Sequence, residues 1–100
     1  MLRLFFQNPH FSLGKITLTQ LVNAYFAEDN TFSEEIYHAL TSYSQKNWGL
    51  ISKQSKDPNE EAIQNHCDRV NAEYETSLGR IHITTHFESD ITMVLFVSED

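Results

Sequence analysis

The second half of the chain holds four histidine and cysteine residues, whose side chains often bind metal ions: His66, Cys67, His82 and His86. His82 and His86 are four residues apart on a predicted strand, so they share one face but lie roughly 13 Å apart. Zinc bonds its ligands at about 2 Å, which excludes a shared ion for this pair. His66 and Cys67 are neighbours on a predicted helix and point about 100° apart. We therefore predict no metal site and interpret the strand histidines as polar residues of the sheet surface.

Candidate nucleophiles and acid–base groups lack the neighbours that catalysis needs. Cys67 would require a histidine and an orienting carboxylate beside it, yet we expect it on the buried stripe of a helix, where a free cysteine behaves as a small apolar residue. The carboxylate pairs Glu34-Glu35 and Glu60-Glu61 fall at predicted helix N-termini, where capping and the helix dipole explain them. Three isolated glycines cannot form a phosphate-binding loop. The sequence thus predicts a protein that is not an enzyme and holds no cofactor.

The composition indicates one folded domain over residues 1–100. The apolar fraction of 40% and the charged fraction of 21% are ordinary for a globular protein. A single cysteine cannot form an internal disulfide, which favours a reducing compartment and a cytoplasmic location. No apolar run approaches the roughly 18 residues that a membrane span needs. The apolar start is too short for a signal peptide, so residues 1–12 are expected to form a strand or a flexible arm.

The formal net charge is −7, and the seven basic residues are scattered along the chain. Nucleic-acid binding needs a basic stripe that neutralises phosphates, so direct binding to nucleic acid or to an anionic membrane is not expected. An acidic balance fits either a soluble surface or a basic partner.

The first half of the chain predicts one strand and two helices. Residues 13–19 form a short strand rich in β-branched residues, and Thr19 caps a helix that stops near Asp29-Asn30. Ser33 opens a second helix, with Glu34 and Glu35 in its first turn. This helix is expected to end at Asn47-Trp48-Gly49, with Gly49 in a left-handed conformation.

The second half predicts a helix and three strands. Asp57-Pro58-Asn59-Glu60 has the pattern of an N-cap followed by a capping box, which starts a helix that runs to about Cys67. From Val70 onwards the apolar period is two, giving strands at 70–76, 80–87 and 91–97. The last strand is apolar almost throughout, so it is expected to be central or covered on both faces. The prediction is an α+β fold in the order β-α-α-α-β-β-β: an antiparallel sheet with a C-terminal three-stranded meander and helices packed on one face.

Five short segments resemble a family of small proteins from plasmids, prophages and integrative elements. They are Leu13-Gly14-Lys15-Ile16, Asn47-Trp48-Gly49, Glu60-Glu61-Ala62-Ile63, Arg80-Ile81-His82-Ile83-Thr84-Thr85 and Thr92-Met93-Val94-Leu95-Phe96. The resemblance spans residues 13–99. The chain departs from the family pattern at His86, where an acidic residue is usual. The resemblance brings no established chemistry; it implies an accessory protein of a mobile element, a setting in which small acidic proteins often inhibit host defence.

Two functions from different classes of binding protein follow as hypotheses. In the first, a mobile-element protein inhibits a host defence complex, such as a CRISPR–Cas complex, by occupying a surface built for nucleic acid. In the second, an antitoxin-like or regulatory protein binds one cognate protein as a homodimer. The predicted partner-binding residues are Asp57, Glu60, Glu61, Glu73, Glu75 and Trp48. Trp48 is expected either to pack in the core under a loop or to anchor a partner from the surface.

Overall fold

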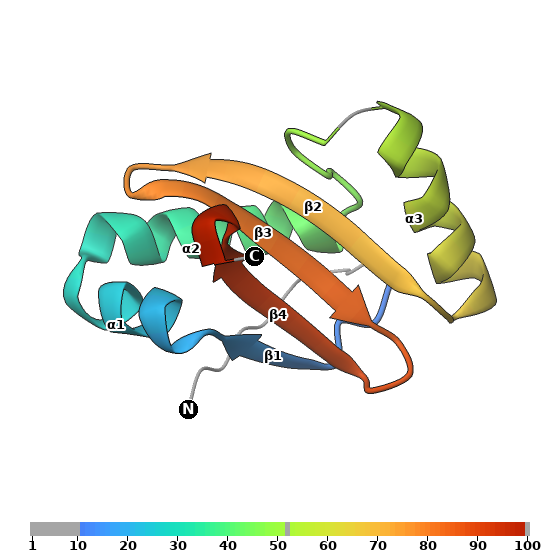
Figure 1. Cartoon of the computed structure of the whole chain (residues 1–100), viewed down its shortest axis with the longest axis horizontal. Coiled ribbons are helices and arrows are strands. Elements are labelled where there is room, and N and C mark those ends of the chain that lie inside the picture. Colours follow the sequence, from blue (N-terminus) through green and yellow to red (C-terminus); the bar gives the residue numbers. More distant parts are fainter. Residues whose placement is uncertain (1–10, 52, 100) are drawn as a thin grey trace.

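The computed structural model describes residues 11–51 and 53–99, with side chains left out for residues 53–57. The elements follow in the order β1 (Lys15–Leu18), α1 (Gln20–Glu28), α2 (Asn30–Ser44), α3 (Lys53–Asn65), β2 (Arg69–Thr76), β3 (Gly79–His86), β4 (Ile91–Phe96) and a short 3-10 helix η1 (Val97–Glu99), as Figure 1 shows. This is the predicted α+β order. The expected strand or arm at residues 1–12 falls mostly outside the described residues. None of the helices in the described part is long and apolar enough to cross a membrane.

The strands form one four-stranded sheet in the order β1-β4-β3-β2. β2, β3 and β4 make the predicted antiparallel meander. β1 pairs with β4 in parallel, so the sheet is mixed and the prediction of a wholly antiparallel sheet was wrong at β1. Three helices and two strands separate β1 from β4 along the chain, and a connection of this length permits a parallel pair.

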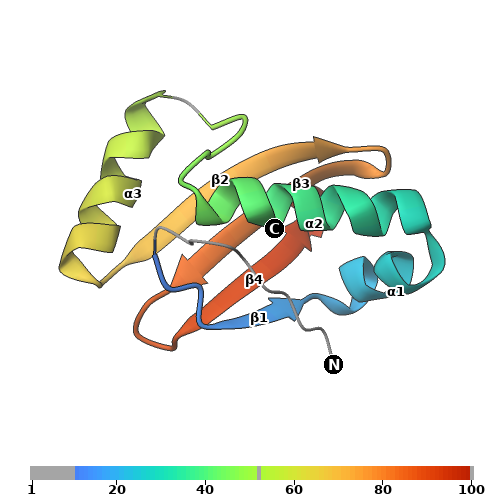
Figure 2. The ribbon, with the colours of Figure 1, turned by 180° about the vertical axis from the view of Figure 1, so that it is seen from behind.

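The helices cover one face of the sheet, and α3 stands at its edge. α2 lies across the face that Figure 2 presents, with α1 beside it near the ends of β1 and β4. α3 flanks β2 at the far end of the molecule. The core lies between α2 and the sheet, and its largest fully buried apolar side chains are Tyr43, Phe32, Ile36, Leu40, Ile81, Ile83, Val22, Val70 and Val94.

Two of the helix starts differ from the sequence prediction. The side chain of Thr19 caps α1 as expected, accepting from the Val22 N–H at 3.3 Å. α2 begins at Asn30 because the Asp29 carboxylate accepts from the Phe32 N–H at 3.0 Å, whereas Ser33 was the predicted cap. Asp29 therefore both ends α1 and starts α2.

α3 begins at Lys53, so Pro58 lies inside the helix and Asp57 is not its N-cap. A proline removes only one backbone hydrogen bond, and the helix-favouring residues before it extend the helix by more than a turn. The predicted capping box at Glu60 is wrong for the same reason. α3 ends at Asn65, which leaves Cys67 half-buried beyond the helix rather than on its buried stripe.

Gly49 adopts the predicted left-handed conformation, but it does not end α2. α2 stops at Ser44, and Lys46 adopts a positive φ of 66° while the Asn47 N–H bonds the Ser42 carbonyl at 2.9 Å. Gly49, at φ 69°, instead forms a bridge with Glu73 of β2, where an added Cβ would collide with the Glu73 carbonyl.

Candidate functional site

Trp48 belongs to the core, as the first of its two sequence interpretations expected. Its side chain is 3% exposed, and its ring contacts Phe11 at 5.8 Å and Tyr43 at 5.4 Å between centroids. Its backbone pairs with Glu73 of β2, which pulls the segment after α2 against the sheet. A partner cannot reach this indole in the folded protein, so the prediction of Trp48 as a surface anchor was wrong.

The predicted acidic residues of α3 lie at the end of the molecule where this helix flanks β2. Glu60 Oε2 pairs with Lys46 Nζ at 3.3 Å, and the side chains remain partly exposed. Glu61 is exposed and forms no ion pair within the described residues. The side of α3 that packs on the protein includes the buried residues Asn59 and Ala62, and helical spacing puts Glu61 on the opposite side of the helix. The side chain of Asp57 lies outside the described residues.

Glu73 and Glu75 lie on β2 and share a single cation. Arg80, on the neighbouring strand, approaches both carboxylates at 3.7 Å. Such partly exposed, long ion pairs contribute well under 1 kcal/mol each, so a competing partner can break them at little cost. β2 alternates, and both side chains project from the face of the sheet opposite α2.

The predicted acidic residues therefore form two groups rather than one patch. Glu60 pairs with Lys46, which follows α2, whereas Glu73 and Glu75 project from the opposite face of the sheet. The sequence could not separate the groups because their positions depend on how α3 docks on β2.

The face of the sheet opposite α2, here called the outer face, is covered by no helix but η1 within the described residues. Its three apolar side chains on β4 are Ile91, Met93 and Leu95; Met93 is 38% exposed and the other two are half-buried. β4 is central, as predicted, but it is covered on one face only. The polar side chains of the outer face are Lys15, Thr17, Arg69, Asn71, Glu73, Glu75, Arg80, His82, Thr84 and His86.

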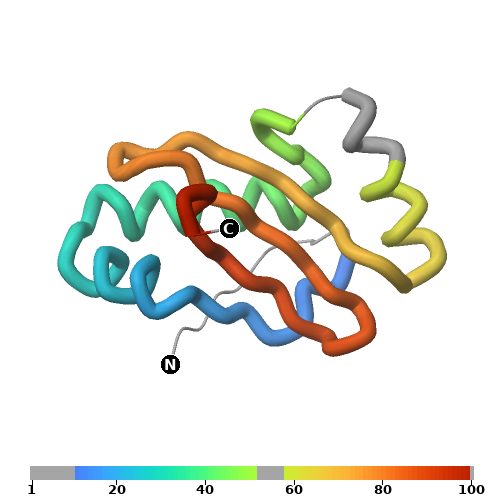
Figure 3. The backbone as a smooth tube through the Cα atoms, in the orientation of Figure 1, coloured from blue at the N-terminus to red at the C-terminus, as the bar shows by residue number. Residues whose placement is uncertain are grey.

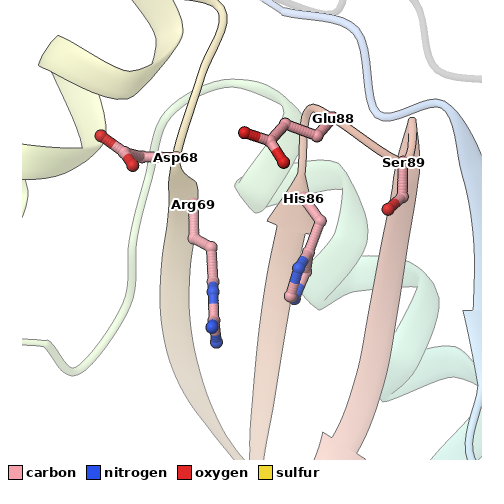
Figure 4. Close-up of a pocket in the computed structure, with 5 residues that line it drawn as sticks. All are labelled: Asp68, Arg69, His86, Glu88 and Ser89. Atoms are coloured by element: carbon pink, nitrogen blue, oxygen red, sulfur yellow. The ribbon is translucent and has the colours of Figure 1, made fainter.

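A polar hollow of about 230 Å³ lies at one end of this face. It is lined by Asp68, Arg69, His86, Glu88 and Ser89, and Figure 4 shows Arg69 and His86 side by side on neighbouring strands. No ion pair joins Arg69 or His86 to a carboxylate among the described residues. His86 thus lacks the oriented carboxylate of a catalytic dyad, and the hollow offers contact groups rather than an activated nucleophile.

A second cavity of about 360 Å³ lies between α2 and β2, and two of its polar side chains, Glu35 and Tyr74, are hydrogen-bonded within the protein. The Glu35 carboxylate accepts from the N–H and the hydroxyl of Ser77, the latter at 2.6 Å. The Tyr74 hydroxyl donates to the Asn47 carbonyl, and burial raises the pKa of Tyr74 above its ordinary value. These bonds tie the β2–β3 hairpin and the segment after α2 to the core.

The histidines lie as the strand spacing predicts. His82 and His86 both project from the outer face, and His82 Nε2 lies 3.0 Å from Asn71 Oδ1. His66 follows α3 and packs on the ring of Phe87 at 4.8 Å. In residues 11–51 and 53–99, no three His, Cys, Asp or Glu side chains come together as metal ligands.

The strand histidines were correctly predicted on the surface of the sheet, whereas the outward positions of Ile91, Met93 and Leu95 were not predicted. Residues 91–97 are apolar almost throughout, so the sequence of this strand has no alternation that separates its two faces. A comparison with known proteins gives no significant match to any family model, curated protein or solved structure.

Proposed function

We propose that this protein is a non-enzymatic accessory protein of a mobile genetic element that binds and inhibits a host defence complex, acting as an anti-CRISPR protein in the cytoplasm. The observation that carries the proposal is the position of α3, which presents Glu60 and Glu61 at the outer end of the molecule. The net charge of −7 and the resemblance to mobile-element proteins support it.

The mechanism proposed is electrostatic competition. A complex that handles nucleic acid binds phosphates with rows of Lys and Arg. Glu61 carries an unpaired carboxylate in the described structure, and Glu60 exchanges Lys46 for a cation of the target. Charge pairs that are well placed in a desolvated interface contribute on the order of 1.5 kcal/mol or more, whereas the exposed Lys46–Glu60 pair contributes less than about 1 kcal/mol. The exchange therefore favours the complex.

The test is a plasmid-interference assay in cells that carry an active CRISPR effector. We expect the wild-type protein to restore transformation by a targeted plasmid and the Glu60→Lys, Glu61→Lys double variant to lose this effect. The matched control is Glu28→Lys, Glu34→Lys, which makes the same change in net charge at exposed positions on α1 and α2. Full interference in the presence of the wild-type protein, across the effector types tested, would refute the proposal.

A further inference from the structure

The outer face carries apolar side chains that nothing in the described structure covers. Met93 and Val97 are exposed, at 38% and 36%, and Ile91 and Leu95 are half-buried beside them. All four follow one line along β4 into η1. A line of this kind across the centre of a sheet face is typical of the middle of an interface, with polar residues around it.

The two ends of the outer face carry different charged side chains. The strand register places Lys15, Ile91, His86 and Arg69 in one row across the sheet, at the end where the hollow lies. Arg80 and Glu75 form a row at the other end, where Val97 and Glu99 of η1 also lie. One end thus offers Lys15 and Arg69 with carboxylates around the hollow, and the other offers Glu75 and Glu99 with one arginine.

The two ends also differ in shape. The hollow of about 230 Å³ marks the end with Arg69 and His86. At the opposite end η1 rises over β3 on the same face, as Figures 1 and 3 show. A raised turn at one end and a hollow at the other fit together when a second copy is placed face to face and reversed.

From this we infer that the outer face binds a second copy of this chain about a two-fold axis. The axis runs across the strands, midway between the rows of Met93 and Leu95, in the plane between two aligned sheets. It brings Met93 against Leu95 of the second copy and Ile91 against its Val97. It also brings Arg69 towards Glu75 of the second copy. Arg80 of the second copy comes over His86, beside Asp68 and Glu88 at the hollow.

The area of the face sets the strength of the dimer. The outer face is three inter-strand spacings wide and four rows of side chains long. With the margins included, a dimer would bury about 550 Å² of each protomer, or about 1,100 Å² in total. That is near the lower limit of specific interfaces, so we expect dissociation in the micromolar range. The inference goes beyond the inhibitor function and does not depend on it, because α3 stays outside this interface.

The first experiment measures the dimer by sedimentation velocity over a range of protein concentrations from about 1 μM to about 1 mM. We expect the wild-type protein to shift from monomer to dimer, and Met93→Lys to remain monomeric throughout. The matched control is Tyr37→Lys, which is 43% exposed on α2, the helix that covers the opposite face of the sheet, and it should dimerise as the wild type does. A wild-type protein that stays monomeric, or a control that loses dimerisation equally, overturns the inference.

The second experiment tests the orientation of the axis by charge exchange. Arg69→Glu and Glu75→Arg should each weaken the dimer about tenfold or more, since each places like charges together. The double variant should restore the dissociation constant to within about threefold of the wild type, because the pair is re-formed in reverse. All variants are first shown to have the wild-type circular dichroism spectrum. A double variant that is weaker than both single variants contradicts the proposed two-fold arrangement.

Discussion

The side chain of Asn59 pairs with both backbone groups of Asn71. Its Nδ2 donates to the Asn71 carbonyl at 2.7 Å, and its Oδ1 accepts from the Asn71 N–H at 2.9 Å. Asn59 is 1% exposed on α3, and Asn71 lies on β2, one of the two edge strands of the sheet. The amide thus takes the place of a neighbouring strand, docks α3 on the sheet and closes part of an edge that would otherwise pair with other chains.

Replacing Asn59 by alanine should therefore be severely destabilising. The change removes two hydrogen bonds and leaves both backbone groups of the half-buried Asn71 without their protein partners, a loss of about 2–4 kcal/mol. The free energy of unfolding from urea titration measures it. Glu60→Ala, at the adjacent exposed position, should change stability by less than about 1 kcal/mol. Equal effects of the two substitutions would show that the Asn59 pairing does not hold α3.

A buried chain of hydrogen-bonded hydroxyl groups predicts that Thr92→Val destabilises the protein more than Tyr43→Phe does. Thr92 donates to the Leu13 carbonyl at 2.6 Å, so Thr85 must donate to Thr92 and Tyr43 to Thr85, because each hydroxyl has one hydrogen. Thr92→Val removes the donor to Leu13 and the acceptor of Thr85, and should cost about 2–3 kcal/mol. Tyr43→Phe leaves Thr85 donating and should cost about 1 kcal/mol. Urea titrations that give the reverse order would contradict this direction of donation.

Stability should fall at alkaline pH because of Tyr43. Desolvation by burial raises the pKa of Tyr43 in the folded protein, whereas its pKa in the unfolded chain is about 10. Above pH 10 the unfolded chain loses this proton first, so unfolding is favoured by up to about 1.4 kcal/mol per pH unit. We expect the stability advantage of the wild type over Tyr43→Phe to shrink between about pH 9 and 11. An advantage that stays constant over this range would argue against a buried, neutral Tyr43.

Gly49 should tolerate substitution less well than Gly79. An added Cβ at Gly49 would collide with the Glu73 carbonyl at a φ of 69°, whereas at Gly79 it would meet no atom within 4 Å. Gly49→Ala should therefore push the segment after α2 off β2 and cost more than about 2 kcal/mol, with a smaller loss for Gly79→Ala from its positive φ. Thermal unfolding of both variants measures the difference, and equal melting temperatures would contradict it.

Strand alternation and local capping residues allowed part of the fold to be predicted from the sequence, whereas features that depend on tertiary contacts were not predicted. The alternation of residues 70–76 and 80–87 predicted the meander because each strand buries one face. Thr19 was correctly predicted as the N-cap of α1 because its short hydroxyl side chain reaches the backbone of the first turn. The parallel placement of β1 depends on its contact with β4, and the burial of Trp48 depends in part on its contact with Phe11; both contacts join segments that are distant in sequence. Pro58 misled the assignment of α3, since proline is most frequent at the first position of a helix but here lies inside one.

The pairing of acidic residues shows the same limit at the candidate site. Glu60 and Glu61 were expected to cap a helix, but Glu60 meets Lys46 from the segment after α2. Glu73 and Glu75 share Arg80 because the β2–β3 register places Arg80 opposite Glu75. A sequence can show that these carboxylates exist, whereas the cation that each one meets follows from the packing of the elements.

The most direct test of the inhibitor function is the affinity for a purified CRISPR effector complex whose interference the protein suppresses, measured across a series of salt concentrations. The account predicts that the Glu60→Lys, Glu61→Lys variant binds at least about tenfold more weakly than the wild type, and that its remaining affinity depends less on salt. The Glu28→Lys, Glu34→Lys control should bind nearly as the wild type does. An affinity of the Glu60→Lys, Glu61→Lys variant equal to that of the wild type at every salt concentration would contradict the account.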